Sequence, residues 1–209
     1  MTAPSDIIEN RNNRRELTDE HYVALVRNGD TDAFRKLVER HQKKMLNIAY
    51  RMTGDYEEAC EVVQEAFLSA FKAITKFRGD AQFSTWLTSI TINHARSRIR
   101  QITSRFLREG SSTDDPLDTD TGRVIREPPS GDASPEECLA QKEIQQKVQD
   151  CIGSLDTEFR EVLVLRDIRG FSYDEIHVIL NLPDGTMKSR LFRARESVKN
   201  CLKKAFGDL

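Results

Sequence analysis

The sequence predicts an all-α protein made of two small helical domains joined by a flexible linker. Apolar residues recur at helical spacing through most of the chain, and helix-capping sequences precede several of these segments. Residues 103–133 are instead rich in Gly, Pro, Ser, Thr and Asp without periodicity, so they cannot bury enough apolar surface to order themselves. No stretch favours a strand, because even the apolar run 162–165 lies among capped, helically periodic segments.

These observations divide the 209 residues into four parts. We expect a polar N-terminal arm over residues 1–17 and a first helical domain over 18–102. An acidic flexible linker is expected over 103–133, and a second helical domain over 134–209. The length suits one or two domains of this kind.

The first domain is predicted to contain three main helices. In the segment 32–52, apolar residues fall on one helical face: Phe34, Leu37, Val38, His41, Met45, Ile48 and Ala49. The segment 54–77 opens with a capping Asp55 and Glu58 three residues later, and a second set of residues lines one face: Val62, Ala66, Ala70, Ala73 and Ile74. The sequence FRGDAQFSTW then breaks the pattern at Gly79, and a further helix begins near Ser84.

The second domain carries four helix signals. Ser134-Pro135 with Glu137 is a strong helix start, and Asp156 is a candidate cap for the helix that follows. Ser172 and Glu175 form a predicted capping box for the segment 173–180. The turn 181–183 then ends that helix and leads into the last one, over 184–206. A short capped helix, a tight turn and a second helix form the helix-turn-helix pattern.

The last helix has the two faces that insertion into a DNA groove requires. One stripe is apolar and is expected to pack on Val164, Ile176 and Leu180; it contains Met187, Leu191, Ala194, Val198 and Leu202. The other face presents candidate DNA contacts: Thr186, Lys188, Ser189, Phe192 and Arg193. Arg190 and Arg195 are either phosphate clamps or ordinary surface residues, and Gly185 allows close approach of a phosphate to the helix start.

The charge of the chain is segregated although its formal net charge is only −2. Five arginines and no carboxylates lie between residues 94 and 108, and seven bases with one acid lie between 186 and 204. The segment 110–137 between them holds eight acids and two bases. Two basic segments separated by an acidic one suggest two contacts with one long polyanion.

The composition also excludes several classes of protein. No apolar run approaches the ~18 residues of a membrane span, and the N-terminus lacks the apolar stretch of a secretory signal, so we expect a cytoplasmic protein without membrane insertion. The four cysteines have no zinc spacing and are expected to be reduced thiols on helices. There is no P-loop, HExxH motif or Cys/His dyad, so we expect no cofactor, no metal and no enzyme activity.

Two blocks of sequence resemble one known family. Residues 154–199, beginning SLDTEFREVLVLRDIRG, resemble region 4 of bacterial sigma-70 family factors of the extracytoplasmic-function (ECF), sigma-E-like class. Residues 54–100, which contain VVQEAF, resemble region 2 of the same class. The two matches stand in the expected order and, with the segment between them, span about 150 residues.

The resemblance implies that the chain binds core RNA polymerase, through its beta-prime coiled coil and beta flap, and directs transcription initiation at promoter DNA. Region 4 would read the −35 element as duplex through the last helix, with Arg160 and Arg169 as further phosphate contacts. Region 2 would dock on the polymerase through Glu61, Gln64, Glu65 and Leu68. An anti-sigma factor is a further expected partner.

Region 2 would also open the −10 element by capturing a flipped base. The residues implied are in the loop and the following helix: Gly79, Asp80, Gln82, Phe83, Asn93, Arg96 and Arg100. Phe83 and Trp86 are candidates for stacking on bases, although the sequence STWL makes Trp86 more typical of a core anchor.

Two other functions remain open from sequence. The chain could be a self-sufficient helix-turn-helix regulator whose N-terminal half senses a ligand or dimerises. It could also be an enzyme, such as a carboxylate-dependent nuclease. The first is opposed by the combination of VVQEAF, the glycine-broken loop and the arginine run, and the second by acids that fall on exposed helix positions or in the linker.

Overall fold

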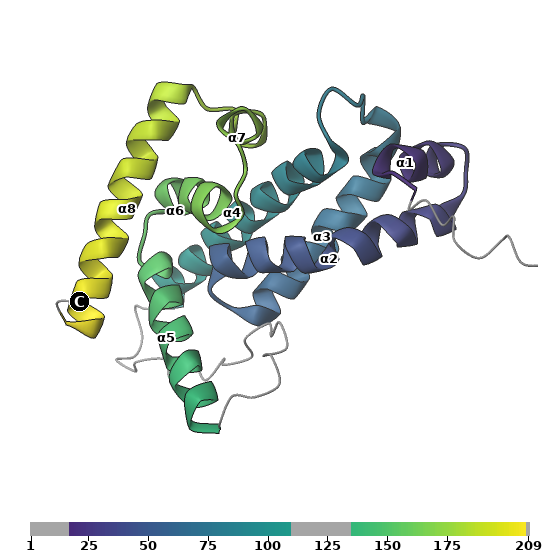
Figure 1. Cartoon of the computed structure of the whole chain (residues 1–209). Helices are drawn as coiled ribbons and strands as arrows, with labels where there is room; N and C mark the ends of the chain where they lie inside the picture. Colours follow the sequence, from purple (N-terminus) through teal and green to yellow (C-terminus); the bar gives the residue numbers. More distant parts are fainter. Residues whose placement is uncertain (1–16, 110–134, 208–209) are drawn as a thin grey trace, which may run out of the picture.

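The computed structural model describes residues 17–109 and 135–207, and all regular elements within these ranges are helical. The first group of helices comprises α1 (Asp19–Arg27), α2 (Thr31–Thr53), α3 (Tyr56–Ala73), the short 3₁₀ turn η1 (Ile74–Lys76) and α4 (Phe83–Glu109). The second group comprises α5 (Pro135–Gly153), α6 (Thr157–Leu163), the π-helical turn η2 (Val164–Ile168), α7 (Tyr173–Leu180) and α8 (Asp184–Phe206). The all-α prediction is confirmed, and Figure 1 shows the two groups as neighbouring halves of the molecule.

Two of the predicted capping residues make their capping hydrogen bonds. The Asp55 side chain accepts a hydrogen bond from the Glu58 backbone N–H (2.8 Å), and Ser172 and Glu175 form the expected capping box at the start of α7. Asp156 stands at the N-cap of α6 but its side chain makes no capping hydrogen bond, which corrects that prediction. Ser134 lies outside the described residues.

The core of the first helical group forms where helical periodicity predicted it. Leu37, Met45 and Ile48 of α2 are fully buried in one cluster with Val62 and Ala70 of α3, and Ala66 is buried as well. Burying apolar side chains of this size contributes about 1.5–3 kcal/mol each. The same stripe residues that predict each helix therefore also join α2 and α3 into one unit.

The apolar stripe of α8 is also placed as predicted. Met187, Leu191 and Ala194 are buried in the same core cluster as Ile176 and Leu180 of α7. Asn181 ends α7 in the left-handed conformation (φ 52°), which turns the chain sharply into α8. This packing fixes α8 on its neighbours and leaves its opposite face outside.

Two parts of the predicted domain plan fall partly or wholly outside the described residues. Helix α4 continues to Glu109, so the first seven residues assigned to the linker are helical. The rest of that linker, and nearly all of the N-terminal arm, lie outside the described ranges. Within residues 17–109 and 135–207, no helix combines the length and apolar character that crossing a membrane requires.

The two helical groups contact each other directly. Gln149 of α5 accepts a hydrogen bond from the Arg51 side chain (2.9 Å), and its own amide N–H donates to the Tyr50 carbonyl of α2 (3.4 Å). The Lys44 ammonium lies 4.2 Å from the centre of the Phe171 ring, and burial lowers the pKa of Lys44, as Arg169 does to a smaller extent. Helices α4 and α7 also pack together across this boundary.

One prediction about the cysteines is wrong. Cys151 of α5 and Cys201 of α8 form a disulfide with a Cα–Cα distance of 5.7 Å, whereas both were expected to be reduced thiols. The two residues are separated by 50 positions in the sequence, and only the packing of α5 beside α8 brings them together. Cys60 of α3 carries a free thiol.

A candidate nucleic-acid and protein interface

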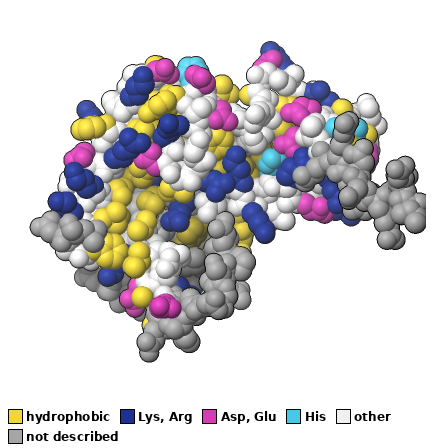
Figure 2. Space-filling model, in the orientation of Figure 1, with side chains coloured by type: hydrophobic (Ala, Val, Ile, Leu, Met, Phe, Trp, Pro, Cys, Tyr) yellow, Lys and Arg dark blue, Asp and Glu magenta, His cyan; other side chains and the backbone are white. Residues whose placement is uncertain are grey.

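The outer face of α8 is the first candidate surface. Lys188, Ser189, Phe192 and Arg193 are exposed there, and Thr186 is half-buried at the helix start. Figure 2 shows Lys and Arg side chains gathered over the half of α8 nearest α7, interspersed with apolar ones. Phe192 is 68% exposed, so this face holds a large ring in solvent among cations. Cationic and aromatic side chains together suit contact with nucleic acid.

Two arginines of α8 are held by acids of the neighbouring helices. The Arg195 guanidinium makes a bidentate ion pair with Asp167 (2.8 and 2.7 Å), and this hydrogen bonding raises the pKa of Arg195. Arg190 pairs with Glu158 of α6. Both arginines are therefore ion-paired in this conformation, whereas Arg193 is exposed.

Arg160 does not lie where a phosphate contact requires. Its side chain is 9% exposed, and its guanidinium donates hydrogen bonds to the carbonyls of Met52, Gly153 and Leu155. Burial lowers the pKa of Arg160. This arginine joins the two helical groups, so its assignment as a DNA contact was wrong.

The loop before α4 forms the second candidate surface. Gly79 has φ 84°, a conformation that favours glycine, and the loop leaves Asp80 and Gln82 exposed. Phe83 is fully buried, with its ring 5.9 Å from that of Phe77. Phe83 therefore cannot stack on a base in this conformation, because it anchors the loop to the core.

Trp86 belongs to the same aromatic cluster. Its ring lies 5.0 Å from that of Phe77 and 5.7 Å from that of Phe83, and it is only partly buried. These contacts agree with its interpretation as a core anchor.

Helix α4 displays the three residues expected to follow a DNA strand, but one of them is engaged. Asn93 and Arg100 are exposed. Arg96 makes a bidentate ion pair with Glu161 of α6, with both N–O distances at 2.7 Å, and the Glu161 side chain is 2% exposed. The basic face of α4 is thus partly occupied by an acid from the other helical group.

The basic stripe of α4 extends beyond the predicted site. Arg105 and Arg108 line a shallow hollow of about 420 Å³ together with Arg100. The arginine run was visible in the sequence, but the change in composition near residue 103 placed these two residues in a linker. Their helical position continues the cationic face by two turns.

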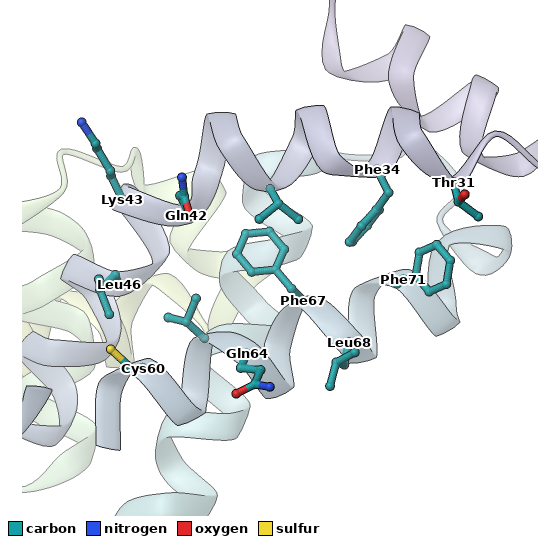
Figure 3. A pocket seen from close by; sticks show the side chains of 12 residues that line it. Thr31, Phe34, Gln42, Lys43, Leu46, Cys60, Gln64, Phe67, Leu68 and Phe71 are labelled. Carbon is teal, nitrogen blue, oxygen red and sulfur yellow. The ribbon is translucent and has the colours of Figure 1, made fainter. Parts of the chain in front are cut away.

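The third candidate surface lies along α2 and α3. Figure 3 shows Phe34 pointing from α2 and Phe67 from α3 into the space between these helices, with Leu68 and Gln64 at its rim. The groove has a volume of about 720 Å³, and Leu68 is 52% exposed. An exposed apolar groove of this size marks a site for binding another molecule.

The predicted docking carboxylates lie beside this groove. Glu61 pairs with Arg98 of α4, and Glu65 lies 3.2 Å from His94 Nδ1. Both acids remain more than half exposed. Glu61 and Glu65 lie one turn apart on the side of α3 that is turned to α4, whereas Gln64 and Leu68 line the groove. The α2 side of the groove was missed from sequence because its apolar residues also fit an ordinary core stripe.

The described residues contain no group of three or more His, Cys, Asp and Glu side chains placed to hold a metal ion. The fold and its surfaces define a helical protein with a helix-turn-helix unit and a second helical unit that carries an exposed apolar groove.

Comparison with known proteins identifies the class more closely. Residues 37–105 match the family model described as sigma-70 region 2, and residues 145–198 match that of sigma-70 region 4. The chain is 37% identical over 190 residues to the RNA polymerase sigma-H factor of Pseudomonas aeruginosa, with 88% of this chain and 93% of that protein covered. It is equally similar to the ECF RNA polymerase sigma-E factor of Escherichia coli K12, covering 88% of this chain and 94% of the relative.

Solved structures agree with these matches. CnrH, in complex with the cytosolic domain of CnrY, is 26% identical with a TM-score of 0.62, and the match covers 89% of this chain and 97% of that one. The sigma factor RpoE of Bartonella quintana, in complex with the anti-sigma factor NepR, has the same TM-score at 20% identity and so shows a shared fold; 81% of this chain and 96% of that one are covered. The chain belongs to the sigma-70 family, in its ECF class of RNA polymerase sigma factors. The region 2 match favours this assignment over a stand-alone helix-turn-helix regulator.

Proposed function

We propose that this chain is a promoter-specificity subunit that binds core RNA polymerase and starts transcription at promoters with −35 and −10 elements. The observation that carries this proposal is the presence, in one chain, of a helix-turn-helix unit and a region 2 unit with an apolar docking groove. The chain acts by binding and positioning, while the polymerase performs the chemistry.

Helix α8 is proposed to read the −35 element as duplex DNA. Its apolar stripe is buried, so the face with Lys188, Ser189 and Arg193 is the one available to the major groove. A bidentate contact from Arg or Lys to guanine contributes about 1–3 kcal/mol of discrimination. Thr186 and Phe192 flank these residues, and Arg190 and Arg195 are held by acids at the margin of this face.

The loop and α4 are proposed to hold the parted −10 strand. Asp80 and Gln82 are exposed beside Gly79 and can hydrogen-bond a base edge. Three residues spaced along α4 are proposed to contact the phosphates of this strand: Asn93, Arg96 and Arg100. Extruding a base costs a few kcal/mol, which single-strand contacts of this kind offset.

The groove between α2 and α3 is proposed to receive the coiled coil of the polymerase beta-prime subunit. Leu68 and Phe67 supply apolar area in the groove, and Glu61 and Glu65, on the neighbouring side of α3, supply charge for a basic partner. We propose the beta flap as the contact of region 4.

An anti-sigma factor is proposed as the regulator of this chain. The structures of CnrH and of the Bartonella sigma factor each contain such a protein or a cytosolic domain bound to a similarly folded chain. A protein that covers the α2–α3 groove would exclude the polymerase from it.

Run-off transcription with core RNA polymerase tests the proposal. Holoenzyme reconstituted with the chain selects promoter fragments from genomic DNA, and these fragments then serve as templates. We expect transcripts from defined start sites only when the chain is present. Leu68→Arg is expected to abolish co-elution with core, whereas the matched change Leu139→Arg, at another exposed apolar position, leaves it intact. Failure of the unmodified chain to co-elute with core would falsify the proposal.

A further inference from the structure

The Cys151–Cys201 pair has one sheltered and one accessible member. Cys151 of α5 is 2% exposed, whereas Cys201 of α8 is partly exposed. Cys201 lines a surface hollow of about 500 Å³ together with Lys204. A nearby ammonium group stabilises a thiolate, so Cys201 has the surroundings of a reactive cysteine and Cys151 has those of a protected partner.

The cross-link lies next to a contact between the two helical groups. Among the side chains of α5 that the structure describes, Gln149, Cys151 and Ile152 at the C-terminal end are buried, while residues 139–147 are exposed. Gln149 hydrogen-bonds the Arg51 side chain and the Tyr50 carbonyl of α2, two residues before the cross-linked Cys151. The cross-link joins two helices of the second group, and the end of α5 that it orders is the end that presents Gln149 to α2.

We propose that Cys151 and Cys201 form a reversible thiol–disulfide site for peroxide oxidants, whose oxidised form holds the two helical groups together. The Cys201 thiolate attacks the peroxide, which leaves a sulfenic acid and releases water or an alcohol. The Cys151 thiol then attacks that sulfur, the S–O bond breaks, and a second molecule leaves as water. A small dithiol reverses the reaction by attacking the accessible Cys201 sulfur and becoming a disulfide itself.

If the chain works beside RNA polymerase, this cysteine pair is a reversible switch and not a permanent cross-link. The inference of reversibility rests on the proposed function. Bacterial RNA polymerase works where thiol systems keep most cysteines reduced, and disulfides there are usually transient. The oxidised form is then the occasional state, produced when peroxide is present.

Holding the groups together affects the DNA-binding face. In the joined arrangement, Glu161 of α6 occupies the Arg96 guanidinium, which is a proposed contact to the −10 strand. Oxidation therefore favours a form with Arg96 engaged, and reduction releases α5 and allows the groups to part. Peroxide is expected to weaken promoter binding, and a dithiol is expected to restore it.

The test uses the full chain in two redox states. The reduced chain is treated with hydrogen peroxide or left untreated, alkylated with a maleimide, and analysed by mass spectrometry after proteolysis. We expect two fewer alkylated thiols after peroxide, with Cys151 and Cys201 joined in one peptide pair. Small-angle scattering should give a smaller radius of gyration for the oxidised chain, and a dithiol should return it to the reduced value.

Variants separate the pair from the other cysteines. Cys201→Ser and Cys151→Ser should each keep the reduced radius in peroxide, whereas Cys138→Ser, which leaves both sulfurs of the pair in place, should still respond. Equal alkylation of Cys151 and Cys201 before and after peroxide would overturn the proposal, as would identical radii in the two states. Loss of core polymerase binding in both redox states would instead contradict the proposed function and leave the thiol chemistry standing.

Discussion

At the scale of single residues, position relative to the core decides what each charged side chain of α8 can do. Arg190 and Arg195 lie beside acids of α6 and η2 and are oriented by them. Arg193 is exposed on the face opposite the buried Leu191. An arginine that is exposed on a groove-facing surface can exchange water for a base edge at little cost, because no ion pair must first be broken.

We expect Arg193→Ala to weaken binding of −35 duplex by about 1–3 kcal/mol, the usual range for one bidentate base contact. Fluorescence anisotropy of the chain with a labelled promoter duplex measures this loss. Lys36→Ala, which removes one exposed cation from α2, is the control and should leave affinity unchanged. Equal losses for both variants would mean that only total charge matters at this surface.

The two faces of α8 can also be separated by stability. Leu191→Ala removes a side chain that is 2% exposed, so it should lower the free energy of unfolding by about 2–5 kcal/mol. Phe192→Ala removes a larger side chain that is 68% exposed, and should lower it little while weakening DNA binding. Urea unfolding monitored by circular dichroism distinguishes the two, and the reverse order of effects would place the wrong face in the core.

At the scale of elements, capping side chains determine where the helix-turn-helix begins. Ser172 accepts a hydrogen bond from the Glu175 backbone N–H (3.2 Å), and the Glu175 carboxylate accepts one from the Ser172 N–H (2.8 Å). These two bonds satisfy backbone donors that the first turn of α7 leaves unpaired. Because α7 supports α8, its first turn also sets the position of the reading helix.

Ser172→Ala is therefore expected to lower the free energy of unfolding by about 0.5–2 kcal/mol. Ser197→Ala, on an exposed position of α8, removes the same hydroxyl without a cap and should change stability by less. Thermal unfolding of both variants measures the difference. No greater loss for Ser172→Ala than for Ser197→Ala would contradict the role of the capping box.

Local signals account for how much of this structure could be predicted from sequence. Capping bonds and apolar periodicity involve residues that are close together in the sequence, as at Asp55, at Ser172 and along α2, α3 and α8. The positions of the helices and their buried faces can therefore be read from the sequence. The Cys151–Cys201 bond and the Arg96–Glu161 pair join residues 50 and 65 positions apart, and no periodicity specifies such partners. The candidate docking and DNA-facing residues could be nominated from sequence because they lie in blocks that resemble a known family. Phe83 and Arg160 were misjudged because residue type alone does not reveal burial.

At the scale of the whole molecule, the contact between the two helical groups sets how much of the DNA-binding surface is available. The Arg96–Glu161 pair is bidentate, and Glu161 is almost completely buried. A carboxylate that is buried in the joined arrangement needs a charged partner there, and Arg96 supplies it. DNA phosphates must compete with Glu161 for Arg96.

We expect Glu161→Gln to shift the free chain toward a more extended form and to strengthen binding of single-stranded −10 DNA, because a neutral amide holds the Arg96 guanidinium less tightly. Small-angle scattering and anisotropy with a labelled strand measure the two effects. Glu158→Gln, which alters the more exposed pair with Arg190, is the matched control and should leave the radius of gyration unchanged. A Glu161→Gln chain that keeps both its radius and its affinity would show that the pair does not limit access.

The aromatic cluster beneath the loop before α4 has a practical consequence. Trp86 is the single tryptophan of the chain, and it lies against Phe77 and Phe83 directly below the segment proposed to hold a flipped base. Its emission spectrum and quenching by iodide therefore report on that segment without any attached dye. Promoter opening can then be followed in real time by stopped-flow fluorescence of the unmodified chain. The tryptophans of the polymerase are replaced for this purpose, or their emission is subtracted.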